Sequence, residues 1–145
     1  MEIRRLRPDD VDVVGAASPL FDNPARREWA SLFLTREGHH MLVASVDGTD
    51  VGFVSGVEMT HPDKGTEMFL YELFVGEAHR RRGIGRGLVD ALRALAVQHG
   101  CYGMWVGTET DNVAAIATYR AAGAAAVEPF VTLTWHFPVD PAPAG

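Results

Sequence analysis

The sequence predicts a single domain of the α/β class, an α+β arrangement around one mixed β-sheet. The chain has 145 residues, of which 47% are hydrophobic, and this is enough for one buried core without a second domain. Strand-like segments joined by short turns run up to residue 75, and a strand-helix-strand-helix-strand pattern continues from there. Strands first and alternating elements afterwards are typical of a mixed sheet flanked by helices.

Short elements are predicted before residue 40. Residues 3–6 form a first strand. Pro8 opens a helix that ends near residues 18–19, because proline fits the first turn of a helix. Apolar residues at helical spacing predict a second helix over residues 23–36.

A meander of three strands comes next. Residues 41–46 and 51–59 form two strands around a hairpin turn at residues 47–50. A second turn at residues 61–65 leads into a strand over residues 68–75. The last of these strands is apolar almost throughout, as expected of a central strand that is covered on both faces.

Helices and strands alternate in the second half. Ile84 begins a helix with one apolar face, which ends at residues 99–100. A strand over residues 102–108 and a helix over residues 112–122 follow. A last strand is predicted over residues 130–137, where apolar side chains alternate.

One domain over residues 1–137 and a flexible tail over residues 138–145 are expected. The first residues are too polar for a signal peptide, and no apolar run approaches the ~20 residues that span a bilayer. We therefore expect a cytoplasmic protein with no membrane partner. The net charge of -6 argues against sequence-independent binding of nucleic acid, which depends on basic surface. It favours a cationic partner, although many soluble proteins are acidic without such a partner.

Neither the cysteine nor the histidines predict a reactive or metal-binding site. Cys101 is the single cysteine, so it cannot form an internal disulfide, and its place at a strand start indicates a packed thiol rather than a nucleophile. His39 and His40 are adjacent in a strand, where neighbouring side chains point to opposite faces. They cannot both bind one ion without a kink, so we expect no metal.

An Arg/Gly-rich turn joins a strand to a helix between Leu73 and Val89. Gly83, Gly85 and Gly87 let the backbone approach an anion closely, and the first amides of the helix lack partners within it. Together with the helix dipole and nearby arginines, these amides favour a bound phosphate. The spacing fits neither a P-loop nor a dinucleotide fingerprint. The segment predicts a pyrophosphate cradle, and the alternative is a solvated face of arginines.

A second motif lies on the helix over residues 112–122. Asp111 or Asn112 caps this helix, and Gly123 can end it in a left-handed conformation. The two motifs resemble those of the GNAT acetyltransferase superfamily: Arg80-x-x-Gly83-x-Gly85 and Asn112-x-x-Ala115-x-x-x-Tyr119-x-x-x-Gly123. The resemblance covers about residues 67–124, which is more than a third of the chain.

This resemblance implies a fold, a cofactor and a set of contacts. The GNAT fold has two central parallel strands, which would splay apart after Val75 and after Val106. The cofactor is acetyl-coenzyme A (acetyl-CoA). The implied cofactor-binding residues are Leu73, Phe74, Val75, Arg80, Arg81, Arg82, Gly83, Ile84, Gly85, Arg86, Gly87, Asn112 and Tyr119.

Acetyl transfer to an amine needs a base for the amine and an acid for the departing thiolate. Tyr119 matches the family tyrosine that protonates the thiolate, and its alternative role is a core aromatic. Asn112 either contacts the cofactor or only caps its helix. An acid such as Glu72 is costly in an apolar strand unless it is paired or used, and such a site raises a carboxyl pKa toward neutrality. We expect Glu72 to be the base, directly or through a water; its alternatives are binding the amine or pairing with an arginine.

Carboxylates near the second central strand extend this hypothesis. Glu109 and Asp111 follow that strand and would bind the acceptor together with Glu72, or would be plain loop residues. A closer resemblance is to the aminoglycoside 3-N-acetyltransferases of GNAT type. It rests on Tyr71-Glu72-Leu73-Phe74-Val75, on Glu77-x-His79-Arg80-Arg81-x-Gly83-Ile84 and on the spacing from Glu109 to Tyr119.

That resemblance also has departures. The related enzymes carry Asp in place of Glu72 and of Glu109, the last strand is longer here, and the segment before Met41 is shorter. We therefore expect an acetyl-CoA-dependent N-acetyltransferase of a small polycationic amine, an aminoglycoside in the narrower reading, with 3-N-acetylation and antibiotic resistance. The alternatives are another amine (a polyamine, an amino acid or a protein amino terminus) or a non-catalytic acyl-CoA-binding module. The apolar last strand offers an edge for a homodimer.

Overall fold

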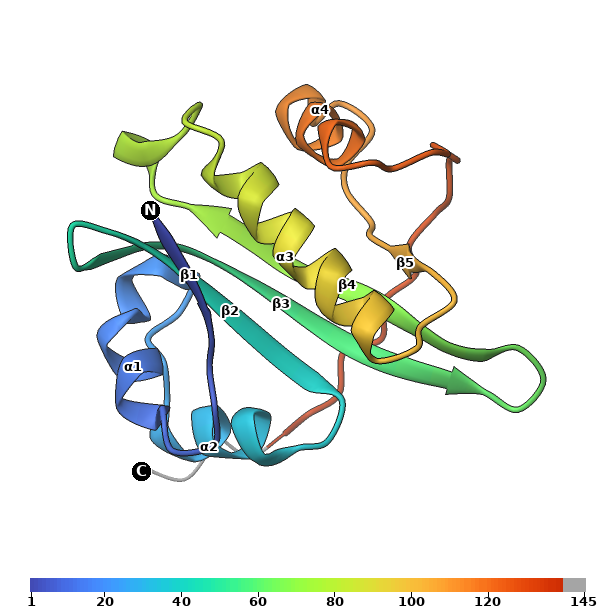
Figure 1. Ribbon diagram of the computed structural model, residues 1–145. Coiled ribbons are helices and arrows are strands. Elements are labelled where there is room, and N and C mark those ends of the chain that lie inside the picture. Colours follow the sequence, from blue (N-terminus) through green and yellow to red (C-terminus); the bar gives the residue numbers. More distant parts are fainter. Residues whose placement is uncertain (140–145) are drawn as a thin grey trace.

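A computed structural model describes residues 1–139 of the chain (Figure 1). The strands are β1 (Glu2–Arg5), β2 (His39–Val46), β3 (Thr49–His61), β4 (Gly65–Val75) and β5 (Met104–Trp105). The helices are α1 (Val11–Ala16), α2 (Arg27–Thr35), α3 (Ile84–Gln98) and α4 (Val113–Ala121). Two short 3-10 turns, η1 (Ser18–Leu20) and η2 (Glu77–His79), complete the regular structure.

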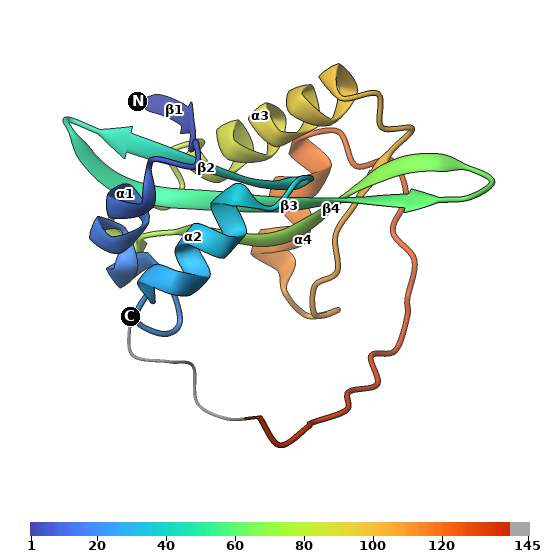
Figure 2. The same cartoon turned by 90° about the horizontal axis from the view of Figure 1, so that it is seen from below.

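All five strands form one sheet in the order β1-β2-β3-β4-β5. Neighbours are antiparallel from β1 to β4, whereas β5 pairs with β4 in parallel. Helix α3 covers one face of the sheet, and α1 and α2 cover the other (Figure 2). The predicted class, a mixed sheet flanked by helices, is confirmed. Among residues 1–139 no helix is both long and apolar enough to cross a membrane, and the cytoplasmic location stays a prediction.

Two hydrophobic clusters, one on each face of the sheet, hold the layers together. Side chains alternate along a strand, so β2 contributes to both clusters: Leu42 and Ala44 face α3, while Met41 and Val43 face α1 and α2. Leu92 of α3 is completely buried. Burial of one such side chain contributes about 1.5–3 kcal/mol relative to exposure.

Glycines mark both ends of α3. Gly83 is the residue before the helix, with φ 79°, and Gly100 follows its end with φ 76°. Residues with a Cβ avoid this left-handed region, so the two glycines fix where the helix begins and ends. The predicted helix with an apolar face from Ile84 and an end near residues 99–100 is confirmed. The 15 residues of α3 separate its two ends by about 22 Å.

A β-bulge interrupts β4 at Tyr71. In the pairing with β3, Ser55 lies opposite Glu72 and Gly56 lies opposite Leu70, which leaves Tyr71 without a partner. The extra residue reverses the alternation of side chains beyond it. Even-numbered residues of β4 face α3 before the bulge, and odd-numbered residues do so after it. Glu72 therefore points to the face of α1 and α2.

The parallel contact between β4 and β5 is shorter than expected. The strand predicted over residues 102–108 is reduced to β5, which pairs only with Met68 and Phe69 of β4. The two strands therefore part after Phe69, and not after Val75 and Val106 as the resemblance implied. Within residues 1–139 no strand pairs with the outer side of β5. Because only its short contact with β4 supports it, β5 stays short.

Residues 124–139 form an exposed arm without regular secondary structure, called the C-terminal arm below. The predicted last strand over residues 130–137 is therefore wrong for this chain on its own. Val131 is 81% exposed and Trp135 is 72% exposed. Alternating apolar residues form a strand only where a sheet edge pairs with them, and the arm leaves the body of the molecule instead (Figures 1 and 2). Residues 140–145 of the expected tail lie outside the described residues.

The two N-terminal helices are shorter than predicted. Helix α1 ends before η1, and α2 begins at Arg27 rather than near residue 23. Residues 21–26 form a loop between them. The backbone N–H of Ala25 donates to Ser18 Oγ at 2.8 Å, which holds this loop in place.

Candidate active site

Two cavities meet at the carboxyl end of β4. The large cavity, of about 1060 Å³, lies between the end of β4, the N-terminus of α3 and α4. The small cavity, of about 320 Å³, opens toward η1 and the loop after it. Leu73, Phe74 and Ala115 line both cavities, so the two spaces are adjacent.

Most of the predicted cofactor residues line the large cavity. They are Leu73, Phe74, Val75, Arg80, Arg81, Gly83, Ile84, Gly85 and Arg86. Asn112 and Tyr119 line the small cavity instead. Arg82 and Gly87 line neither. Gly87 packs against the N-terminal strand, because a Cβ at this position would lie 3.2 Å from Met1 Cε.

Unpaired backbone amides surround the start of α3. The first helical hydrogen bond runs from Gly87 N to Gly83 O at 2.9 Å. The amides of the preceding turn therefore have no partner within the helix. Arg81 has φ 61°, which is uncommon for a residue with a side chain, and Gly83 has φ 79°. The turn thus presents N–H donors and the positive end of the helix dipole to the large cavity.

The arginines of the turn differ in what they contact. Arg80 Nε donates to Val75 O at 2.9 Å, and its guanidinium lies 5.7 Å from the ring centre of Phe74. This side chain anchors the turn to the end of β4. Arg86 forms a surface ion pair with Asp90 at 3.7 Å. Such pairs contribute about 0–1 kcal/mol, so Arg86 can turn toward a phosphate at little cost.

The outer edge of β4 beyond Phe69 carries backbone groups that no strand pairs within residues 1–139. This follows from the short contact with β5. The segment Leu73 to Val75 lies in this stretch and lines both cavities. Its backbone groups that face away from β3 are open to a bound molecule, except Val75 O, which accepts a hydrogen bond from Arg80.

Glu72 lies in the small cavity close to Asp22, which comes from the loop after η1. Solvent still reaches the Glu72 side chain. Burial of its carboxyl nevertheless raises the pKa of Glu72 above the usual value, and the negative charge of Asp22 raises this pKa further. No lysine or arginine pairs with Glu72 among the described residues, so the alternative of a structural ion pair is not supported.

Tyr119 reaches the small cavity from α4. Its ring also packs against the cluster under α3, so Tyr119 is a core aromatic that lines the cavity as well, and its role as proton donor stays a prediction. Burial raises the pKa of the phenol. Tyr119 is therefore protonated at neutral pH, as a proton donor must be.

Three polar residues precede or begin α4. Asn112 Oδ1 accepts a hydrogen bond from Ala115 N at 3.1 Å, so the predicted cap is confirmed. A cofactor contact of Asn112 stays a prediction. Glu109 and Asp111 are exposed in the loop before α4 and do not line the small cavity, although Gly107 and Asn112 of the same loop do. Their role as acceptor-binding carboxylates also stays a prediction.

Sequence reasoning missed the wall that closes the small cavity from the far side. This wall consists of Leu20, Phe21 and Asp22, and the ring centres of Phe21 and Phe53 lie 4.7 Å apart. No motif marks this loop, which is far from Glu72 in the sequence. The bulge at Tyr71 brings Glu72 to its face, and a bulge leaves no clear sign in an apolar strand.

A family comparison decides what this pair of cavities belongs to. A model of the Acetyltransferase (GNAT) family matches residues 6–124, which contain both cavities. The chain belongs to the GNAT acetyltransferase family. Members of this family use acetyl-CoA as the acetyl donor.

Curated relatives match part of the GNAT domain. The chain is 34% identical over 80 residues to L-2,4-diaminobutyric acid acetyltransferase of Nocardia farcinica, which is 55% of this chain and 40% of the relative. It is 34% identical over 87 residues to mycothiol acetyltransferase of Salinispora tropica, 58% of this chain and 26% of the relative. The chain thus matches less than half the length of these curated relatives.

Solved GNAT structures match nearly the whole chain. An aminoglycoside acetyltransferase from an uncultured soil metagenomic sample, in complex with sisomicin, has a TM-score of 0.85 at 20% identity and covers 94% of this chain and 96% of its own. Another from such a sample has a TM-score of 0.77 at 26% identity, with 96% and 98% covered. The aminoglycoside N-acetyltransferase AAC(6')-Iy in complex with CoA has a TM-score of 0.76 at 19% identity, with 94% and 95% covered. At such identities the likeness establishes the fold.

Proposed function

We propose that this protein transfers an acetyl group from acetyl-CoA to an amine of a small polycationic acceptor. The observation that carries the proposal is the meeting of the two cavities: Glu72 and Tyr119 line the small one, and the phosphate cradle lines the large one. The large cavity fits a cofactor that carries phosphate groups, because backbone amides at a helix start are donors for phosphate. Gly83 stands among these donors; its positive φ favours glycine, and no neighbouring atom would touch a Cβ there.

The residues divide the reaction between them. Acetyl-CoA supplies the acetyl group as an activated thioester. The amides around Gly83 hold the pyrophosphate, and the open edge of Leu73 to Val75 orients the thioester end. Glu72 removes a proton from the acceptor ammonium, directly or through a water, so that the neutral nitrogen can attack. Tyr119 then gives its phenolic proton to the departing sulfur.

Charge in the small cavity supports a cationic acceptor. Glu72 and Asp22 line it together, and a ligand with several ammonium groups would relieve their mutual repulsion. An aminoglycoside is the leading candidate, supported by the folds of aminoglycoside acetyltransferases; position 3 is its expected site by the sequence resemblance. A small diamino acid is the second candidate, because the diaminobutyric acid acetyltransferase has such an acceptor in its name.

A thiol-release assay with acetyl-CoA and a panel of amines tests this function. We expect turnover on an aminoglycoside or on a diamino acid, and NMR of the product identifies the acetylated nitrogen. If neither class of amine is acetylated while CoA still raises the melting temperature, the proposed acceptor is wrong and the proposed cofactor stands. If CoA does not change the melting temperature, both the acetyltransferase proposal and the alternative of a non-catalytic acyl-CoA-binding module are wrong.

We also propose that the C-terminal arm of one copy pairs with β5 of a second copy. Both halves of such a contact are exposed: the alternating apolar residues of the arm and the outer edge of β5, where Trp105 stacks on Phe69 at 4.3 Å. An apolar groove of about 370 Å³ lies beside β5. A strand from a second copy would cover both and complete the sheet.

Light scattering on the full chain tests the pairing. We expect a dimer that Leu133→Asp converts to a monomer, because Leu133 lies on the apolar side of the alternation. Thr134→Asp is the matched control on the other side and should remain dimeric. A monomeric wild-type chain would contradict the proposal, and arm amides protected from hydrogen exchange in that monomer would show that the arm folds onto its own β5.

A further inference from the structure

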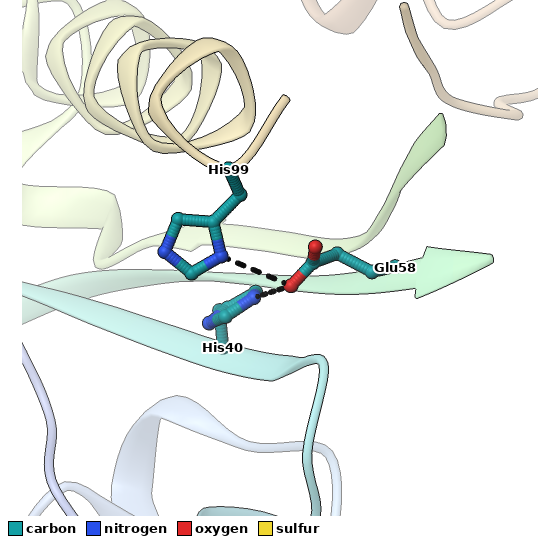
Figure 3. Close-up of side chains that lie close together, drawn as sticks. All are labelled: His40, Glu58 and His99. Atoms are coloured by element: carbon teal, nitrogen blue, oxygen red, sulfur yellow. Dashed lines mark hydrogen bonds and ion pairs between the residues drawn. The ribbon is translucent and has the colours of Figure 1, made fainter. Parts of the chain in front are cut away.

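Two histidines and a glutamate meet at the C-terminal end of α3, away from both cavities (Figure 3). His40 comes from β2, Glu58 comes from β3, and His99 follows the last turn of α3. His40 Nε2 lies 2.6 Å from Glu58 Oε2, and His99 Nδ1 lies 3.2 Å from the same oxygen. Three segments that are far apart in the sequence therefore place three donor atoms around one point.

The surrounding structure holds these donors in place. His40 is only 3% exposed, and the centres of the two imidazole rings lie 5.1 Å apart in an edge-to-face arrangement. Gly38 supports the glutamate from behind: its carbonyl accepts a hydrogen bond from Glu58 N at 2.9 Å, and a Cβ at Gly38 would lie 3.4 Å from Glu58 Cβ. Packing therefore fixes His40 and Glu58, and His99 joins them from the exposed end of α3.

We propose that His40, Glu58 and His99 form a binding site for a divalent transition-metal ion, with Zn²⁺ the best fit. Two imidazole nitrogens and one carboxylate oxygen are a donor set that Zn²⁺ favours, and three protein ligands leave a fourth position for water.

Distances in the cluster agree with a tetrahedral site. Metal–ligand bonds of ~2.0–2.1 Å place neighbouring donor atoms ~3.3 Å apart. The 3.2 Å between His99 and Glu58 already has this value, and all three donor atoms lie within 4.8 Å of one another. His40 and Glu58 must separate by roughly 0.7 Å from their present 2.6 Å.

The charge of the cluster also suits a cation. Burial alone would raise the pKa of Glu58, but the hydrogen bonds from His40 and His99 outweigh burial and hold this pKa below its usual value. Glu58 is therefore an anion at neutral pH.

The contact between Arg5 and His40 opposes metal binding. Its NH2 group lies 3.0 Å from His40 Nδ1. A guanidinium can only donate, so Nδ1 carries the lone pair and the proton of the His40 ring is on Nε2, where it faces Glu58. A metal at Nε2 moves this proton to Nδ1 and breaks the contact with Arg5. Arg5 is exposed on the edge strand β1, so its side chain can turn into solvent.

A bound ion would join β2, β3 and the end of α3 about 22 Å from the start of that helix. It would stabilise the folded chain, because the three ligands come together only on folding. This inference does not depend on the acetyl-transfer function.

Titration calorimetry of the tag-free full chain with Zn²⁺ tests the site. We expect one ion per chain. His99→Ala should weaken binding at least ~100-fold, the upper range for changes around a metal site, and Arg5→Leu should tighten it about tenfold. His61→Ala is the matched control, because His61 pairs with Glu67 at 3.1 Å without a second imidazole, and it should bind as the wild type does.

Two results would overturn the proposal. One is the absence of saturable binding by the wild-type chain, and the other is equal affinity in His99→Ala. Glu58→Gln provides a second ligand variant if His99→Ala does not fold, and Co²⁺ absorption gives an independent readout of tetrahedral ligands. Unchanged affinity in Arg5→Leu would refute the assigned tautomer of His40.

Discussion

The two ends of α3 are built from different kinds of sequence. At its start, residues 80–87 are consecutive in the chain, and most of them line the large cavity as the proposed anion cradle. At its end, His99 meets His40 and Glu58, which lie on two other strands. The first end can be recognised by spacing alone. The cluster at the second end exists only once the sheet has formed, so no local sequence pattern predicts it.

The difference predicts a division of labour. Changes near the start of α3 should alter cofactor binding and turnover, whatever they cost in stability. Changes at its far end should alter stability and metal binding and leave turnover intact. Four variants, taken from the largest expected effect to the smallest, test this division.

Replacement of Glu72 by Gln should have the largest effect. It removes the proposed base but keeps the size of the side chain, so kcat/KM should fall about 10²–10⁴-fold while the Kd for CoA stays unchanged. Steady-state kinetics and calorimetry measure the two quantities. Glu37→Gln, an exposed residue that lines neither cavity, is the comparison variant and should keep wild-type turnover. If Glu72→Gln keeps wild-type turnover, the base is another group.

Gly83→Val tests the cradle. A β-branched residue at φ 79° costs about 1–3 kcal/mol, so the turn must move, and we expect the Kd for CoA to rise about tenfold or more. Gly48→Val is a matched control, because Gly48 has φ 78° in the β2–β3 hairpin and equal space around it. It should lower the melting temperature and leave CoA affinity unchanged. Equal CoA affinity in both variants would show that the turn does not hold the cofactor.

Glu58→Gln tests the far end. The loss of two charge-assisted hydrogen bonds should lower the free energy of unfolding at pH 7 by about 1–3 kcal/mol. The pKa of Glu58 is lower in the folded chain than in the unfolded chain, so its contribution is present above the unfolded pKa and is lost as the pH falls through the folded pKa. Urea unfolding of both chains should therefore converge at acidic pH. Reduced kcat/KM in this variant would contradict the division of labour.

Asp22→Asn should produce the smallest effect, a shift in pH dependence. Burial raises the pKa of Glu72 most, and the charge of Asp22 raises it further, so removal of that charge lowers the pKa. A base must be deprotonated to act, and the acidic limb of the kcat/KM profile should move to lower pH. Asp63→Asn, in the β3–β4 turn, should leave the limb in place. A limb that moves to higher pH would contradict the proposed contact.

Much of the fold follows from local pattern, and the exceptions have physical causes. Helix α3 was predicted from Ile84 because its glycines and apolar face are local. The strand predicted over residues 130–137 is not formed, because a strand needs a sheet edge to pair with, and the alternation of apolar residues does not show whether such an edge is present. Of the site, the Arg/Gly turn and Tyr119 could be predicted from motif spacing and Glu72 from its place in an apolar strand, and their roles stay predictions. The wall that carries Asp22 could not, because it depends on the face to which Glu72 points.

The unpaired Tyr71 decides to which face of the sheet the later residues of β4 point. In a regular strand of the same residues, without the bulge, side chains would alternate strictly from Met68, and Glu72 would turn inward beneath α3. A carboxylate would then stand among aliphatic neighbours with no access to an acceptor. A related strand that carried the same residues but paired all of them would therefore lose its base without any substitution.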